Sequence, residues 1–368
     1  MEPKTKWLLS KNKSCSCTMS GVWRAVACCQ GCAVIFHSPM GCVHVAETMD
    51  LGSHYRILAD GRHENIERVP LVSSNIREKD SIFGGTGRLR QSISYVMETY
   101  RPECLFIATS CVAGVIGDDA ESESAEAEMK YGIPVICIPY AGFLGGEYSD
   151  GYYKTAETII DRFFKPCEHV PNRILLLGDQ MGPEGQYVTE VKRLLSLLGL
   201  EVQGQFPGYL PFPEWANAPA AELAIVLGTT GQSDHMNGMA DLLEKKFGIH
   251  AVKDIYPIGW ENTCKWILEI GRLHRNVKKA KVIIEEEKKR IDSYVKSILH
   301  ITKGKKAVIG IGRGTHWYSP SDTISALRQL EMRIEAVILY DNLTDKEKAE
   351  YRHRIGEEES IPVYDGRD

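Results

Sequence analysis

The distribution of apolar residues along the chain predicts alternating strands and helices. Short runs rich in branched residues are typical of buried strands, and most of them are separated by longer segments with apolar residues at helical spacing. The predicted strands begin at Cys32, Cys104, Val135, Arg173, Leu223, Ala307 and Ala336. The predicted helices include residues 87–100, 120–131, 187–198, 239–247 and 321–331. Such alternation is typical of α/β proteins, in which helices cover both faces of parallel sheets.

We expect several Rossmann-like, doubly wound parallel-sheet domains. The first, residues 1–168, ends in a segment with two prolines, after which a new strand begins. The second, residues 169–302, includes a long helix over 278–300 that we interpret as a solvated connector, because its charges have both signs. The third, residues 303–368, has only two predicted strands, one helix and an acidic end. We therefore expect a shortened C-terminal domain that leans on another domain or on a partner chain.

Composition narrows the class of protein. The chain has 368 residues, 43% of them hydrophobic, which is enough for two or three cores of ordinary size. Its formal charge of -5 gives no electrostatic reason to bind nucleic acid or an anionic membrane. The first ten residues contain no apolar run of the length typical of a signal peptide, and no later run approaches the roughly 18 apolar residues that a spanning helix needs. We therefore expect a soluble, cytoplasmic protein with no nucleic-acid or membrane partner.

Eight of the eleven cysteines lie before residue 112. In a reducing compartment this crowding favours metal binding over disulfides. Cys42 and Cys111 each follow a predicted strand at a glycine-containing turn, where the ligands of open α/β sheets gather. A helix that begins just after Cys111 would direct free N–H groups at its thiolate and lower the pKa of the thiol. We interpret three other cysteines as small buried apolar residues: Cys104, Cys137 and Cys167.

Several motifs occur in a distinctive order and spacing. They are His37-Ser-Pro-Met-Gly-Cys, Glu78-Lys-Asp-Ser-Ile-Phe-Gly-Gly, Ala108-Thr-Ser-Cys-Val-Ala-Gly-Val-Ile-Gly-Asp-Asp, Gly231-Gln-Ser-Asp-His-Met-Asn-Gly and Tyr256-Pro-Ile-Gly-Trp-Glu-Asn-Thr. With Cys17, Cys42 and Cys111, these motifs resemble the nitrogenase component 1 family over most of residues 15–270. That family includes nitrogenase molybdenum-iron protein subunits, their cofactor-assembly relatives and tetrapyrrole reductases.

The resemblance implies that Cys17, Cys42 and Cys111 ligate an iron-sulfur cluster, either [4Fe-4S] or P-cluster-like, near a subunit interface. Three thiolates leave a fourth ligand to be found. A partner subunit could supply it, or one of four further cysteines: Cys15, Cys28, Cys29 and Cys32. The resemblance also places Lys79 and Asp80 close to the cluster, as groups that support it without binding it.

The resemblance has one gap. The catalytic subunits of the family anchor their active-site cofactor with a cysteine near the stretch that here reads Gly231-Gln-Ser-Asp-His-Met-Asn-Gly, which contains no thiol. We therefore expect no molybdenum-iron cofactor in the usual binding mode. His235 in this stretch is a candidate catalytic residue, with a helix-terminal surface histidine as the alternative. The sequence has no Gly-x-x-x-x-Gly-Lys-Ser/Thr motif, so we expect ATP to be bound by a separate iron protein.

The leading functional hypothesis is the iron-sulfur subunit of a nitrogenase-like oxidoreductase. It would accept electrons from an ATP-dependent iron protein and pass them to a substrate or a second metal centre, in complex with a homologous or identical component 1 subunit. The alternative is a non-catalytic scaffold for assembly of a nitrogenase-type metal cluster. A zinc-stabilised binding protein is disfavoured, because zinc prefers compact four-ligand sites and the three cysteines come from well separated elements. The sequence leaves the substrate open.

Overall fold

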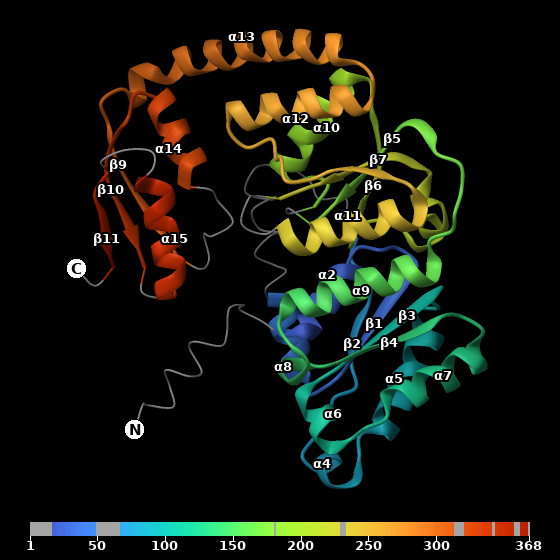
Figure 1. Ribbon diagram of the computed structural model, residues 1–368. Helices are drawn as coiled ribbons and strands as arrows, with labels where there is room; N and C mark the ends of the chain where they lie inside the picture. Colours follow the sequence, from blue (N-terminus) through green and yellow to red (C-terminus); the bar gives the residue numbers. More distant parts are fainter. Residues whose placement is uncertain are drawn as a thin grey trace. The chain divides into compact units, whose positions relative to one another are not determined.

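The computed structural model describes residues 17–48, 67–179, 182–228, 233–312, 320–340, 343–356 and 361–366. In this part of the chain the strands form three sheets, with the orders β2-β1-β3-β4, β6-β5-β7-β8 and β11-β10-β9 (Figure 1). The strand pairs of the first and third sheets are parallel. The expected α/β class is confirmed.

The first sheet carries the residues of greatest interest. Its strands are β1 (Cys32–His37), β2 (Leu71–Ser73), β3 (Cys104–Thr109) and β4 (Val135–Ala141). The central strands β1 and β3 are in register over their whole length, from Cys32 opposite Cys104 to His37 opposite Thr109. The carboxyl ends of the two strands therefore lie side by side, and the turns that follow them leave the same edge of the sheet.

Helices cover both faces of this sheet. They are α2 (Thr18–Val26), α5 (Thr86–Thr99), α7 (Ala120–Tyr131) and α9 (Tyr148–Phe163). Alternate strand residues such as Ile35 and Leu105 face α5 and α7, and pack with Leu89 in one apolar cluster. On the other side, α2 and α9 contact the sheet (Figure 1). Three shorter helices follow the first sheet's turns: α4 (Asp80–Phe83), α6 (Cys111–Ile116) and α8 (Gly142–Gly145).

Two glycines let α2 and α9 pack backbone against backbone. A Cβ atom on Gly21 would lie 2.0 Å from the carbonyl oxygen of Tyr148, and one on Gly151 would lie 2.0 Å from that of Thr18. Real Cβ atoms do not approach carbonyl oxygens so closely, so any larger residue forces the helices apart. The start of α2 is thereby held at a fixed distance from α9.

The second sheet contains the two strands predicted near Arg173 and Leu223, and two further strands that were not predicted, β6 and β8. It contains β5 (Val170–Leu177), β6 (Glu201–Phe206), β7 (Ala221–Val226) and β8 (His250–Val252). The helical segments of this region are α10 (Gln186–Leu198), η1 (Phe212–Ala220), α11 (Ser233–Phe247), α12 (Trp260–Leu273) and α13 (Val277–Thr302). The fully buried Trp215 of η1 contacts Phe106 edge-to-face at 6.1 Å between ring centroids, and so joins this region to the first sheet.

The third sheet is larger than the sequence pattern indicated. Its strands are β9 (Lys306–Ile311), β10 (Arg333–Leu339) and β11 (Val363–Asp365), with helices α14 (Pro320–Gln329) and α15 (Asp345–Gly356). The prediction of two strands and one helix was wrong, because β11 has only three residues and α15 has few apolar positions. A small core including Ile324, Val337 and Leu339 holds these elements together.

The chain divides into two compact units. One comprises residues 1–190, 202–224 and 242–249, and the other comprises residues 191–201, 225–241 and 250–368. The three sheets fall within residues 32–141, 170–252 and 306–365, whereas the division into units passes through the second sheet. The domain boundaries at 168 and 302 therefore stay predictions. Within the described ranges, no helix is both long and apolar enough to cross a lipid bilayer.

Candidate metal centre

The structure brings Cys17, Cys42 and Cys111 together. Cys42 follows β1, Cys111 follows β3, and Cys17 stands directly before α2. Their charges interact: a thiolate at Cys111 acts to raise the pKa of Cys17, and thiolates at Cys17 and Cys111 act to raise the pKa of Cys42. All three thiols belong to residues that are only partly buried. The three predicted ligands thus form one accessible thiol cluster, drawn from three separate elements.

Cys17 is the N-cap residue of α2. Its backbone is extended, at φ −87° and ψ 177°, and it forms an isolated antiparallel bridge with Glu147. Burial raises the pKa of the Cys17 thiol, although the N–H groups of Met19 and Ser20 at the start of the helix act to lower it. These N–H groups would favour a thiolate once a positive metal centre offsets the cost of burial.

Cys111 is the first residue of α6. The side chain of Ser110, the N-cap residue, accepts a hydrogen bond from the N–H of Ala113 at 3.2 Å, which fixes where the helix begins. Gly142 passes so close that a Cβ atom there would lie 2.7 Å from the Cys111 nitrogen and 3.5 Å from its sulfur. The Thr18 hydroxyl donates to the Gly142 carbonyl at 3.0 Å. This bond connects the start of α2, next to Cys17, to the turn beside Cys111.

Cys42 lies in the helical residues 40–48 that follow β1. Its N–H donates to the Pro39 carbonyl at 3.1 Å, which closes the turn between strand and helix. Burial raises the pKa of the Cys42 thiol, and the Ser38 side chain partly opposes this. Burial thus favours the protonated thiol, and a metal that binds here would have to displace that proton.

The donor set suits a cluster better than a single ion. Across the described residues, no three His, Cys, Asp or Glu side chains are placed to hold one metal ion. A zinc ion with bonds of about 2.3 Å would need its sulfur ligands within about 4 Å of one another. An iron-sulfur cluster is larger and is held by thiolates that approach it from different sides. Three neighbouring thiols on separate elements fit that requirement.

The other candidate ligands lie elsewhere. Cys28, Cys29 and Cys32 are buried near the amino end of β1, and the strand rises about 17 Å over its six residues before the turn to Cys42. Burial raises the pKa of Cys29 and Cys32 well above the usual range. The structure does not bring these three to the thiol cluster, and they form an inner group with Cys104, which is opposite Cys32 on β3. Cys15 lies outside the described residues.

The structure also bears on Lys79 and Asp80, which were predicted to lie close to the cluster, and on His235, the candidate catalytic residue. Asp80 begins α4, accepts the N–H of Arg77 at 2.8 Å and pairs with Arg88, while Lys79 precedes it as the N-cap residue. The helix α4 contacts α6, which carries Cys111. His235 belongs to α11, but its side chain lies outside the described residues, so its catalytic role stays a prediction.

A buried polar pair beside the thiol cluster was not singled out from the sequence. The His37 imidazole, at the end of β1, bonds through Nε2 to Oδ2 of Asp118 at 2.9 Å, and both side chains are buried. Both residues belong to the quoted motifs that also contain Cys42 and Cys111. Both residues could therefore have been noticed in the sequence, but the sequence did not show that their two motifs are in contact.

A partly buried ion pair lies at the carboxyl end of β5. Arg24 of α2 donates to both carboxylate oxygens of Asp179, at 2.8 Å from Nε and 2.6 Å from Nη2, and the Tyr209 hydroxyl donates to the same carboxylate. Burial acts to raise the pKa of Asp179, but the charge and hydrogen bonds of Arg24 outweigh it and hold the pKa below its usual value. The pair anchors α2 from the end opposite Cys17.

Solved structures show the same fold. Nitrogenase Cp1 at pH 6.5 matches with a TM-score of 0.66 and 20% identity, over 96% of this chain and 68% of that one. Nitrogenase Cp1 at pH 5 matches with a TM-score of 0.64 and 22% identity, over 88% of this chain and 64% of that one. The α/β architecture of this chain is thus the fold of these two structures.

Sequence comparison defines the family. The family described as nitrogenase component 1 type oxidoreductase matches residues 17–368, and the chain belongs to it. The nitrogenase iron-molybdenum cofactor biosynthesis protein NifE of Clostridium pasteurianum is 34% identical, over 76% of this chain and 58% of the relative. The nitrogenase molybdenum-iron protein alpha chain of Methanosarcina barkeri is 27% identical, over 72% and 49%. The chain thus spans about half to three fifths of the length of these relatives.

Proposed function

We propose that this chain is the iron-sulfur subunit of a nitrogenase-like oxidoreductase. Cys17, Cys42 and Cys111 would hold the cluster, which would supply one-electron transfer at low potential when bound. The electrons would come from an ATP-dependent iron protein and continue to a substrate or a second metal centre. The proposal rests on one observation: the three thiols converge at one edge of the first sheet. The chain that carries them belongs to the nitrogenase component 1 type family.

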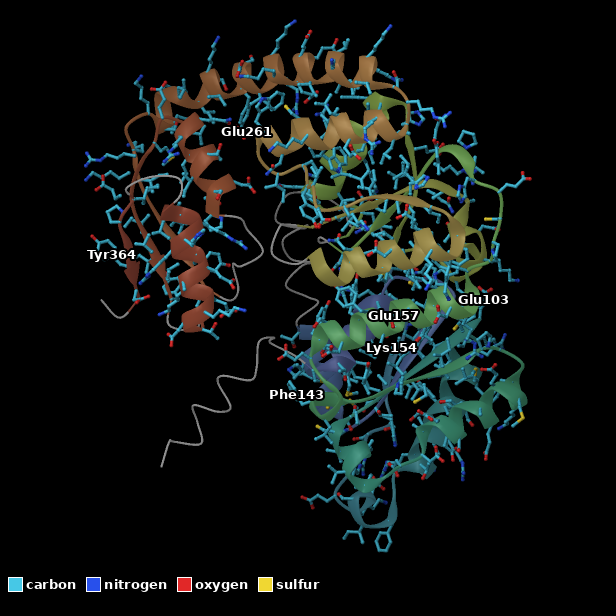
Figure 2. All side chains as sticks on the ribbon, in the orientation of Figure 1. Glu103, Phe143, Lys154, Glu157, Glu261 and Tyr364 are labelled. Atoms are coloured by element: carbon cyan, nitrogen blue, oxygen red, sulfur yellow. The ribbon has the colours of Figure 1, made fainter. Side chains whose placement is uncertain are left out.

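The surface around the thiols supports a subunit contact. Large apolar side chains are exposed on α4, α6, α8 and residues 40–48, although monomeric proteins seldom expose such groups together. Helix α6 contacts both α4 and α8, so these exposed side chains come from adjoining helices. Figure 2 labels Phe143 on α8. We call this set the apolar rim: Met40, Ile82, Phe83, Val115, Phe143 and Leu144. A homologous or identical component 1 subunit covering the rim could supply the remaining ligands of the cluster.

The test is cluster loading under anaerobic conditions. Reconstituted wild-type protein should contain stoichiometric iron and acid-labile sulfide, and should give an EPR signal when reduced. Cys111→Ser should lose most of that iron, because it removes one of only three thiolates. The interpretation of Cys167 as a buried residue was wrong, because it lies in an exposed loop between α9 and β5. Cys167→Ser is therefore the matched control: it removes an exposed thiol outside the cluster and should load as wild type does. A correctly folded wild-type protein without iron would exclude the proposal.

A scaffold for cluster assembly is the second candidate, favoured by the 34% identity to the biosynthesis protein NifE and by the absence of cysteine from Gly231-Gln-Ser-Asp-His-Met-Asn-Gly. The two functions differ in what leaves the protein. Sustained consumption of a reducible substrate, driven by an iron protein and ATP, would support the oxidoreductase. Release of an intact cluster to an acceptor protein, without such turnover, would support the scaffold.

A further inference from the structure

The buried pair His37–Asp118 is part of a continuous hydrogen-bonded chain. Ser74 Oγ lies 2.9 Å from His37 Nδ1, and Asp118 Oδ2 lies 2.9 Å from His37 Nε2. The N–H of Ser38 donates to Ser74 Oγ at 3.1 Å, and the N–H of Gly85 donates to both oxygens of Asp118, at 2.8 and 3.0 Å. The turns after β1 and β2 and the loops before α5 and α7 are thus joined around one imidazole.

The protons of this chain can be assigned from its donors and acceptors. Ser74 Oγ accepts the Ser38 N–H and can donate its own hydrogen to Nδ1 of His37. The other ring nitrogen, Nε2, then carries the hydrogen that is donated to Asp118. A neutral imidazole and an ionised carboxylate satisfy every bond, and burial, which lowers the pKa of His37, favours the same neutral form.

The chain contacts the turns that carry both cysteines. The carbonyl of His37 accepts the N–H of Ser110, the residue directly before Cys111, at 3.1 Å. On the other side, Ser38 joins His37 to the turn that leads to Cys42, and its side chain acts on that thiol. The first of these bonds is a main-chain bond that continues the pairing of β1 with β3. The imidazole of His37 thus lies where the Cys42 and Cys111 turns meet, and its own bonds to Ser74 and Asp118 brace this point.

Gly85 shows how closely these parts fit. A Cβ atom at this position would lie 2.6 Å from Oδ2 of Asp118 and 3.2 Å from Cε1 of His37. Glycine is therefore required for the backbone N–H to reach the carboxylate. The three motifs around His37, Gly85 and Asp118, which are far apart in the sequence, meet at this one point.

The order Asp118–His37–Ser74 is also that of a hydrolytic triad, but its burial excludes that chemistry. Ser74 is 4% exposed and His37 is 0% exposed, so no substrate can reach the hydroxyl. Ser74 Oγ is moreover occupied by the Ser38 N–H. The arrangement serves geometry instead of nucleophilic attack.

We infer that His37 and Asp118 are positioning residues that hold the Cys42 and Cys111 turns at the separation needed to ligate one cluster. Groups that orient ligands in this way typically change metal affinity by about 10- to 100-fold when they are replaced. The inference rests on the proposed function for the identity of the ligand, an iron-sulfur cluster. The positioning of the two turns by His37 and Asp118 does not depend on that function.

The test compares His37→Gln and Asp118→Asn with Glu123→Gln. Glu123 is a matched control, because it is also a buried carboxylate of the first sheet's helices, with two 2.6 Å hydrogen bonds from Arg90, but it has no bond to either cysteine turn. Ser74→Ala, which removes only a hydroxyl, covers the case in which His37→Gln does not fold. Melting temperatures of all variants show how much global stability each has lost.

The first readout uses metal-free, reduced full-length protein. Dibromobimane joins two thiols only where they are close together, and peptide mapping identifies the pair. Cross-links from Cys42 to Cys111 or Cys17 should form in wild type and in Glu123→Gln, and should fall several-fold in the His37 and Asp118 variants. Labelling of the exposed Cys167 is the internal standard and should stay constant. Wild-type protein without cross-links from Cys42, or an equal loss in Glu123→Gln, would overturn the inference.

The second readout is the iron retained against a chelator after reconstitution. His37→Gln and Asp118→Asn should bind iron about 10- to 100-fold more weakly than wild type, and their EPR spectra should broaden. Unchanged retention in both would contradict the positioning role. If no variant, including wild type, takes up iron while the cross-linking differences persist, the proposed function fails and the positioning role stands.

Discussion

At the scale of single residues, His37 makes stability depend on pH. Burial lowers the pKa of His37, and it outweighs the hydrogen bond and charge of Asp118, which act to raise it. A group with a depressed folded pKa contributes stability above its unfolded pKa of about 6.5, and this is lost as the pH falls through the folded value. The unfolded chain then binds a proton that the folded chain does not.

We therefore expect the free energy of unfolding to fall between about pH 7 and pH 5, and this component to be missing in His37→Gln. At pH 7.5 that variant should be about 2 kcal/mol less stable than wild type, because buried partners lose their bonds. Urea unfolding across the pH range measures both. His44→Gln, which changes an exposed histidine, should follow the wild-type curve. An identical pH slope in His37→Gln would show that His37 is not the titrating group.

The residues of the site were only partly predictable. Cys42 and Cys111 could be expected to meet, because each follows a strand and the ends of parallel strands share an edge. The bond between His37 and Asp118 joins residues 81 positions apart. Pairing between two polar turns leaves no periodic pattern, so only the folded structure shows it.

At the scale of elements, the contact between α2 and α9 determines where Cys17 lies. We expect Gly151→Ala to destabilise the protein by about 3 kcal/mol, because its Cβ atom would overlap the Thr18 carbonyl. Iron loading should also fall, since Thr18 is the neighbour of Cys17. Thermal unfolding and iron analysis measure the two effects.

Gly87→Ala is the control for that substitution. Gly87 also lies in a helix, but a Cβ atom there meets nothing within 4 Å, so the change should be neutral or stabilise by about 0.5 kcal/mol. Equal melting temperatures for Gly151→Ala and Gly87→Ala would show that the helices can separate without cost.

The predicted strands are those with continuous apolar runs. β1 and β3 begin and end where their runs of branched residues do, and α7 matches residues 120–131. β2 and β8, with three residues each, were not predicted, because so short a strand shows no alternation. β6, with six residues, was not predicted, because Glu201, Gln203 and Gln205 interrupt its apolar positions. α2 was not predicted either, because small residues such as Ser20 and Gly21 occupy its buried face and interrupt the apolar pattern.

At the scale of the whole molecule, the apolar rim predicts association. Phe83 is 85% exposed and Ile82 is 78% exposed, and burying such side chains against a partner is favourable. We expect Phe83→Asp to weaken binding to a second component 1 subunit, of either kind, by at least about tenfold. Light scattering coupled to size exclusion detects self-association, and co-purification detects a homologous partner.

Met129→Asp provides the comparison, because Met129 is 80% exposed on α7, outside the rim. It should leave association unchanged. An equal effect of both substitutions would point to a general loss of solubility, and no effect of Phe83→Asp would exclude the rim as the contact.

The α/β class could be predicted for the whole chain, but the arrangement of strands could not. The order β2-β1-β3-β4 puts a three-residue strand at one edge, and its partner residues are fixed only once β1 is folded. The third sheet likewise contains a strand that was not predicted, Val363–Asp365, which pairs with β10. Pairing with an existing strand, and not the local sequence, makes these segments extended.

The unequal burial of the cysteines decides where air would damage this protein first. Oxidation follows exposure of the sulfur, and thiols enclosed in the core are inert. The cysteines of the inner group are buried, whereas those of the thiol cluster are partly exposed. Cys167 is also exposed, but it lies outside the cluster, so its oxidation costs no ligand and its thiol has to be subtracted from any count of reactive thiols. A preparation handled in oxygen would therefore lose its metal-binding capacity. Its fold would remain largely intact, and so would the buried thiols of the inner group, which become reactive only on unfolding. Normal secondary structure is thus no guarantee of a competent sample, and the count of reactive thiols before denaturation is the better criterion of quality.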